Sequence, residues 1–129
     1  PNISFLGHVS DEQRKSLMSR AKAVIVTALE DYGLVPIEAN VSGTPVVAYG
    51  AGGVLDTQVP GKTGVFFYRQ SPEAVHQALL KADSNRWDYY QIRDHVLRNF
   101  TEEVFFERVL TIIQEAYERH QTDAVRLSA

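Results

Sequence analysis

Two glutamates in one short stretch of the chain could bind a ligand that is rich in hydroxyl groups. Glu30 and Glu38 lie in EDYGLVPIEA, on either side of a glycine and the expected start of a helix. Ionised carboxylates only accept hydrogen bonds, so their natural partners are pairs of hydroxyl groups such as those of a ribose or a hexose. The pair therefore predicts a site for a polar, hydroxyl-bearing ligand.

The residues between the two glutamates favour an anion site. Gly33 allows a tight turn, and Pro36 is tolerated in the first turn of a helix. The free amides of Leu34 and Val35 would point out of that helix N-terminus, which suits a phosphate. Glu38 would lean back toward the same end without being a phosphate ligand itself. Phosphate on the amides and sugar on the carboxylates together indicate a nucleotide sugar.

Short apolar runs predict the strands that position these residues. They are Ile3–Leu6, Ala23–Val26, Pro45–Ala48 and Gly64–Phe67. Runs without alternation are typical of strands buried on both faces of a parallel sheet. Glu30 would then follow the second strand, at the carboxyl edge where such sheets bind ligands. The glycines that follow the third strand, at 50, 52 and 53, either admit a ligand close to the backbone or serve only the turn.

Helix signals lie between and after these strands. Ser10 to Gln13 is a capping-box pattern that opens a helix to about Arg20, and Ser71 precedes a proline at a first helical position. Apolar residues recur at helical spacing as far as Phe100, and Thr101 caps a last helix with an apolar stripe expected to pack. Alternating strands and helices predict an α/β fold, with residues 121–129 as a frayed tail.

Composition narrows the class of protein. The 129 residues, 44% hydrophobic and 22% charged, suit one globular domain. A net charge of −3 without a basic cluster argues against nucleic-acid binding. Without cysteine there is neither a disulfide nor a thiolate zinc site, and the histidines lack metal-ligand spacing. No run is as long as a membrane span and no signal peptide is present, so a cytoplasmic location is the default expectation.

An ordered series of motifs resembles a known family. After EDYGLVPIEA come GTPVVA, a GG pair and GKTGVFF. This order is similar to the C-terminal, donor-binding domain of retaining glycosyltransferases with the GT-B fold, in family four (group 1), which also resembles bacterial glycogen synthases. PNISFLGHVSDEQ and FTEEVFFERV extend the resemblance to most of the chain. Tyr32 stands where the family usually has Phe, and Asp56 where many members have Glu.

The resemblance implies a Rossmann-like parallel sheet with flanking helices. Residues 1–120 would form a nucleotide-sugar (donor) binding domain that lacks its N-terminal part. Because the family orders its strands 3-2-1-4-5-6 and this chain would hold only the last four in sequence, the sheet is expected to have a gap after the first strand, unless its strand order differs or another segment fills the gap. The parent protein would carry its acceptor site, and an Arg and a Lys that neutralise the donor diphosphate, upstream of this chain.

The resemblance also implies a reaction. The parent would transfer a hexose from a nucleotide-diphosphate sugar with retention of configuration, without metal or other cofactor, in polysaccharide biosynthesis. The isolated fragment would be inactive, and the parent could associate peripherally with a membrane through its missing N-terminal domain. The base, the sugar and the acceptor are not indicated.

Roles for individual residues follow from the same resemblance. Glu30 would be catalytic, at the donor sugar hydroxyls or the reacting region, and Glu38 would bind the ribose diol. His8 and Val9 would flank the base, although His8 could equally be an exposed loop histidine. The remaining expected donor contacts are Asp31, Tyr32, Gly33, Leu34, Val35 and Gly53.

Two other functions remain open from the sequence. Glu30, Asp31 and Glu38 could hold Mg²⁺ for phosphoryl transfer, although no Walker-type glycine loop is present. Alternatively, the chain could be a non-catalytic α/β nucleotide-binding or protein-interaction domain whose acidic residues are simply solvated. Metal-dependent binding would favour the first alternative, and an absence of nucleotide binding would favour an interaction domain.

Overall fold

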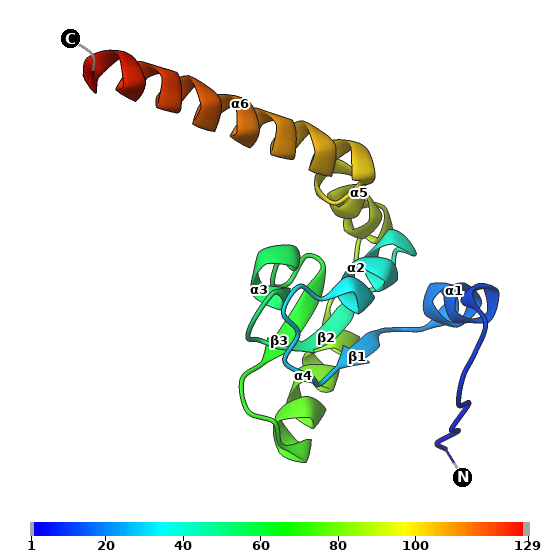
Figure 1. The fold of residues 1–129 in the computed structure, drawn as a ribbon. Helices are drawn as coiled ribbons and strands as arrows, with labels where there is room; N and C mark the ends of the chain where they lie inside the picture. Colours follow the sequence, from blue (N-terminus) through cyan, green and yellow to red (C-terminus); the bar gives the residue numbers. More distant parts are fainter. Residues whose placement is uncertain (1, 128–129) are drawn as a thin grey trace. The chain divides into compact units, whose positions relative to one another are not determined.

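The computed structural model describes residues 2–127, and describes side chains as far as residue 121. Its elements are α1 (Asp11–Arg20), β1 (Val24–Val26), α2 (Leu34–Val41), β2 (Val46–Tyr49), α3 (Val54–Thr57), β3 (Gly64–Phe67), α4 (Pro72–Ser84), α5 (Tyr89–Asn99) and α6 (Glu102–Leu127) (Figure 1). The chain divides into two compact units, Pro1–Val96 and Leu97–Ala129, and each is considered by itself.

The described residues of the first unit form a three-stranded parallel sheet in the order β1-β2-β3. Val26 lies beside Ala48 in the register of β1 with β2, and Ala48 lies beside Phe66 in that of β2 with β3. β2 is the central strand, and Val46, Val47 and Ala48 are at most 1% exposed. An uninterrupted apolar run suits a strand with both faces covered, so the predicted α/β fold with a parallel sheet is confirmed.

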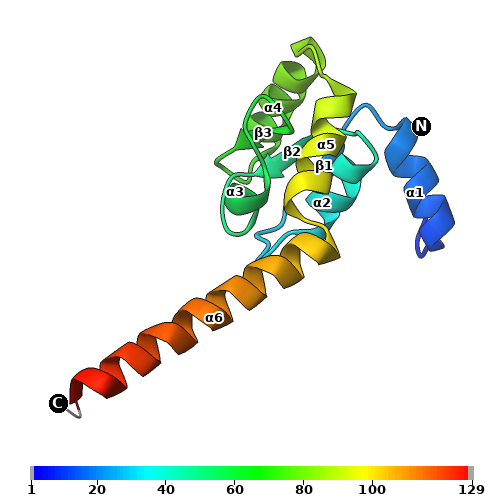
Figure 2. The ribbon, with the colours of Figure 1, turned by 90° about the horizontal axis from the view of Figure 1, so that it is seen from above.

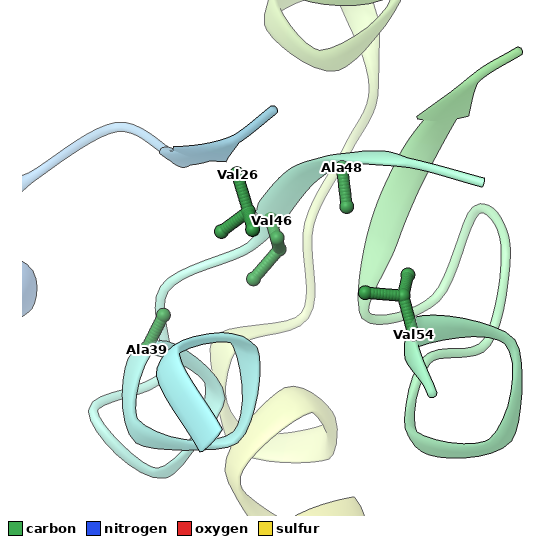
Figure 3. Close-up of a cluster of buried hydrophobic side chains, with 5 residues drawn as sticks. All are labelled: Val26, Ala39, Val46, Ala48 and Val54. Carbon is green, nitrogen blue, oxygen red and sulfur yellow. The ribbon is translucent and has the colours of Figure 1, made fainter. Parts of the chain in front are cut away.

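Helices cover both faces of this sheet, with α2 and α3 on one side and α4 on the other (Figure 1). The first face contributes Val26, Val46 and Ala48, which pack with Ala39 of α2 and Val54 of α3 (Figure 3). On the opposite face, the side chains that pack together are Val47, Val65, Phe67, Ala78 and Ala82. Side chains of a strand alternate between faces, so one short sheet supplies two cores.

Asn40 joins α2 to the loops that lead into β2 and β3. Its side-chain amide donates hydrogen bonds to the carbonyls of Thr44, at 3.0 Å, and Thr63, at 3.1 Å. Asn40 is fully buried, and a buried carbonyl that loses its donor destabilises a fold. This side chain therefore fixes where the amino ends of the two strands lie beneath the helix.

The predicted strand over Ile3–Leu6 is wrong. Residues 2–9 belong to no strand, and Ile3, Phe5 and Leu6 are 73%, 96% and 59% exposed. A strand needs a neighbouring backbone to complete its hydrogen bonds, and in the described part of the chain β1 is paired on one side only. The described sheet therefore has three consecutive strands rather than four. The other predicted strands agree with β1, β2 and β3 to within one residue at each end.

Two helices also differ from expectation. The short α3 was not predicted, because four residues are too few to show a helical period. α6 continues to Leu127 through most of the segment predicted as a frayed tail (Figure 2), since no glycine or proline interrupts residues 102–127. The stripe on α6 expected to pack is instead exposed at Phe105, Ile112 and Tyr117, each more than 60%. None of the described helices combines the length and apolar character that a membrane span requires.

Candidate functional site

The loop that carries Glu30 is tied to the glycine turn after β2. Glu30 forms a parallel bridge with Gly52, and the amide of Gly53 donates a 2.8 Å hydrogen bond to the Glu30 carbonyl. The carboxyl ends of β1 and β2 therefore meet at one edge of the sheet, as the sequence predicted. Glu30 is half-buried there, whereas Asp31 and Tyr32 are exposed.

Both glycines of this turn are required by the loop that packs on them. A Cβ atom on Gly52 would lie 2.4 Å from the Glu30 carbonyl oxygen, and one on Gly53 would lie 2.3 Å from that of Asp31 and 2.5 Å from Cα of Tyr32. Real Cβ atoms do not approach so closely, so a side chain would push the Glu30 loop away. The close approach that the glycines permit is thus to protein backbone. A contact between Gly53 and a donor stays a prediction, and its amide is already bonded to Glu30.

The N-terminus of α2 lies directly after this loop. Gly33 is its N-cap, in a left-handed conformation with φ 85° and ψ 64° that glycine adopts without strain, and no described side chain caps the helix. Leu34 and Val35 in the first turn are 63% and 40% exposed. Uncapped amides at a helix N-terminus carry partial positive charge and can bind an anion. The geometry is consistent with the predicted phosphate site.

Glu38 lies in the second turn of α2 and is bonded to a helix that the sequence did not connect with it. Arg14 of α1 donates from Nη1 to Oε2 of Glu38, and from Nη2 to Oδ1 of Asp11 at 3.1 Å. The hydrogen bond and the negative charge of Glu38 raise the pKa of Arg14 above its ordinary value, with a smaller contribution from Asp11. Arg14 therefore stays cationic at every pH at which proteins are normally handled.

The candidates for the base pocket lie apart from Glu38. His8 is exposed and Val9 is half-buried, and both line a hollow of about 490 Å³ on one side of α1, together with Gln13. Glu38 lines a different hollow of about 440 Å³ between α1 and α2, together with Arg14. The structure thus brings Glu30, Asp31, Tyr32, Gly33 and Gly53 together, but places His8 and Val9 in another hollow.

Acidic side chains of the site do not converge. Among the residues that the structure describes, no group of three or more His, Cys, Asp or Glu side chains is arranged to hold a metal ion. Glu30, Asp31 and Glu38 therefore do not form such a group. Arg14 was missed because a partner 24 residues away on another helix leaves no local signal in the sequence.

Comparison with known proteins gives a consistent family. Residues 1–100 match the model for glycosyl transferases group 1. The chain is 27% identical over 104 residues to "Uncharacterized glycosyltransferase MJ1607" of Methanocaldococcus jannaschii, covering 80% of this chain and 26% of that protein. It is 33% identical over 119 residues to a D-inositol 3-phosphate glycosyltransferase of Corynebacterium diphtheriae, covering 88% of this chain and 28% of that protein. It is 38% identical over 63 residues to the alpha-1,3/1,6-mannosyltransferase ALG2 of Dictyostelium discoideum, covering 48% of this chain and 15% of that protein.

The matched segments amount to between 15% and 28% of the length of these three relatives. The family model, in contrast, covers well over half of this chain. It includes the Glu30 loop, the glycine turn and α2, which are the features that the resemblance in the sequence rested on. The chain belongs to the family of group 1 glycosyltransferases.

Proposed function

We propose that the protein containing this chain transfers a hexose from a nucleoside diphosphate sugar to an acceptor with retention of configuration, and that this chain binds the donor. The observation that carries the proposal is the Glu30 loop, which is anchored to the Gly52–Gly53 turn beside the uncapped N-terminus of α2. Membership of the family supports a role in glycosyl transfer. The carboxylates and the amides suit the two halves of such a donor.

Each part of the site has a role in this proposal. The amides of Leu34 and Val35 bind the diphosphate, whose negative charge grows as the sugar departs; stabilising that charge is the main catalytic task. Glu30 contacts the donor sugar hydroxyls or the reacting carbon, and Glu38 accepts hydrogen bonds from the ribose diol. Asp31, Tyr32 and Gly53 border the sugar. The assignment of His8 and Val9 to the base rests on the resemblance alone, because they line a different hollow from Glu38. The donor site as proposed needs no metal.

The rest of the parent protein completes the site in this proposal. A helix N-terminus carries only about half an elementary charge, which is too little for a departing diphosphate. The resemblance to the family implies that an Arg and a Lys supply the remaining positive charge and that the acceptor site lies elsewhere in the parent. We assign these groups to the part of the parent outside this chain, and expect the chain alone to transfer little or no sugar. A cytoplasmic parent that acts in polysaccharide biosynthesis, with peripheral attachment to a membrane, fits the proposal.

Calorimetric titration with nucleotides tests the donor site. UDP, GDP, ADP and their matching sugar nucleotides are titrated into the full-length parent and into this chain, with EDTA and again with Mg²⁺. We expect one base to be bound with the same affinity in both conditions. Glu38→Ala should lower the affinity for that nucleotide roughly tenfold to a hundredfold, which is what hydrogen bonds to a charged group contribute. Glu73→Ala, which removes an exposed glutamate from the first turn of α4, is the matched control.

The outcomes separate the proposal from its rivals. Binding that requires Mg²⁺ would support the phosphoryl-transfer alternative. A folded parent that binds none of the nucleotides would be an interaction protein, and the proposal would fail. A full-length Glu30→Gln variant that binds the donor normally but turns over roughly a hundredfold more slowly would support the catalytic role of that side chain. Sugar transfer by the isolated chain would contradict the proposed division of the site.

A further inference from the structure

The guanidinium of Arg14 joins two carboxylates that belong to different helices. Its Nη1 donates to Oε2 of Glu38 on α2, and its Nη2 donates at 3.1 Å to Oδ1 of Asp11, one turn back on α1. The side chains of Arg14 and Glu38 are 37% and 36% exposed, whereas Asp11 is 83% exposed. The fork of Arg14 is thus fixed at both ends, with Glu38 at its more sheltered end.

This arrangement does more for orientation than for stability. Ion pairs that are open to solvent contribute little to folding, because water screens the charges and both side chains lose freedom. None of the residues of α1 is buried, so α1 is not attached to α2 by a packed hydrophobic core. A planar guanidinium that is already held by Asp11 loses little further freedom when it bonds a second carboxylate. The pair therefore restricts the rotamers of Glu38 at small cost.

The bond to Arg14 leaves Glu38 able to accept further hydrogen bonds. A carboxylate has about four acceptor sites on its two oxygens, and Arg14 uses one of them, on Oε2. In the part of the chain that the structure describes, no other donor is bonded to this carboxylate. Oε1 remains for a ligand, and its direction is set by the bond on the opposite oxygen.

We propose that Arg14 is a positioning residue for nucleotide binding, which holds the Glu38 carboxylate in the orientation that accepts the ribose diol. The inference rests on the proposed function, and adds to it a residue on α1 that acts through Glu38. Arg14 itself touches neither the phosphate nor the base in this scheme. Its loss should therefore be felt only by ligands that present a diol to Glu38.

The test compares two ligands on the full-length parent. One is the nucleoside diphosphate that the native protein binds among UDP, GDP and ADP, and the other is its 2′,3′-dideoxy counterpart, which has no diol. We expect Arg14→Ala to weaken the binding of the ribonucleotide by up to about fivefold, the upper value for a partly exposed ion pair, and to leave the affinity for the dideoxy ligand unchanged. Arg14→Lys, which keeps the charge but loses the fork, should lie between the native protein and Arg14→Ala.

A double-mutant cycle and a matched arginine complete the test. Arg14→Ala combined with Glu38→Ala should bind the ribonucleotide no more weakly than Glu38→Ala alone, since both remove one interaction. Arg86→Ala, at an exposed position in the connection between α4 and α5, should bind like the native protein. Equal weakening of both ligands by Arg14→Ala, or no weakening of either, overturns the inference while the donor site stands. A native protein that binds no nucleotide overturns the proposed function, and the inference with it.

Discussion

The carbonyl oxygen of Glu30 accepts a 2.8 Å hydrogen bond from the amide of Gly53, and this bond joins the ends of two strands at the candidate site. It holds the loop with the catalytic candidate against a turn that has no side chains to separate them. The loop is thus positioned by backbone, while its carboxylate is left to contact a ligand. Substitutions in the turn should act on the site through this contact.

Gly53→Ala should disturb both stability and binding. Its Cβ atom would lie 2.3 Å from the carbonyl oxygen of Asp31, although its φ of −61° is one that alanine adopts freely. We expect a loss of about 2–3 kcal/mol in the free energy of unfolding, typical of overpacking, and weaker nucleotide binding by the parent. Urea unfolding and calorimetry measure the two effects.

Gly61→Ala separates steric crowding from backbone strain in this experiment. Gly61 has a φ of +77° but no atom within 4 Å of a Cβ. The Gly61→Ala substitution should lower the free energy of unfolding by about 1 kcal/mol, through backbone strain alone, and should leave nucleotide binding unchanged. Equal effects of the two variants on binding would show that the contact between the turn and the Glu30 loop does not position the site.

Asn40→Leu should destabilise the first unit chiefly through the carbonyl of Thr44, because the carbonyl of Thr63 keeps the hydrogen bond from the amide of Val46. The substitution has a similar size, but it removes the donors to Thr44 and Thr63 from a fully buried position. We expect a loss of about 1–3 kcal/mol in the free energy of unfolding, measured with urea. Asn85→Leu is the control, because that amide donates to the Gly61 carbonyl at an exposed place and should change stability by about 0.5 kcal/mol or less. Similar losses in both variants would contradict this account of Asn40.

Ser71→Ala should remove the N-cap of α4. The Ser71 hydroxyl accepts a 3.2 Å hydrogen bond from the amide of Ala74, one of the donors that a helix cannot satisfy internally. Loss of such a cap lowers the free energy of unfolding by about 1 kcal/mol, a change that thermal unfolding can detect. Ser84→Ala, at the exposed far end of the same helix, should have a smaller effect. A larger loss at Ser84 would argue against capping as the cause.

The pKa of Glu103 should depend on Thr101. Hydrogen bonds from the backbone amide of Glu103 and from the Thr101 hydroxyl hold the pKa of this carboxyl below its usual value. A lowered pKa means that the ionised form stabilises the start of α6 at neutral pH, and that this contribution is lost as the pH falls through the folded-state pKa. Thr101→Val should raise the pKa of Glu103 toward its usual value, as followed by NMR titration.

A second threonine of α6 is the control for this titration. Thr111 donates its hydroxyl to the Glu107 carbonyl within the helix, far from the N-terminus. Thr111→Val should leave the pKa of Glu103 where it is in the native chain. A pKa of Glu103 that does not respond to Thr101→Val would mean that the helix end, rather than this hydroxyl, sets it.

Local signals predicted much of the fold. Uninterrupted apolar runs predicted β2 and β3, because a strand that is buried on both faces needs apolar residues at successive positions. The capping box at Ser10 and Gln13 forms as expected, since its two hydrogen bonds join residues three apart. Gly33 also adopts the positive φ that a tight turn before α2 requires. Each of these features depends on neighbours in the chain.

Other features depended on partners that are distant in the chain. Ile3 to Leu6 has the composition of a strand but forms none, because no described backbone lies beside it to complete the hydrogen bonds. The glycines at 52 and 53 are explained by the Glu30 loop, more than twenty residues earlier, rather than by a ligand. The short α3 shows no period of its own and forms where Val54 meets the core.

The sequence by itself determined the family, the parallel strands and the place of Glu30 at the edge of the sheet, because these follow from residue order and short-range geometry. Only the tertiary structure showed that Arg14 is bonded to Glu38, and that the Glu30 loop is held by the backbone of Gly53. The physical reason is that hydrogen bonds and ion pairs act over a few ångströms in space. A partner that folding brings within that range can lie anywhere along the chain.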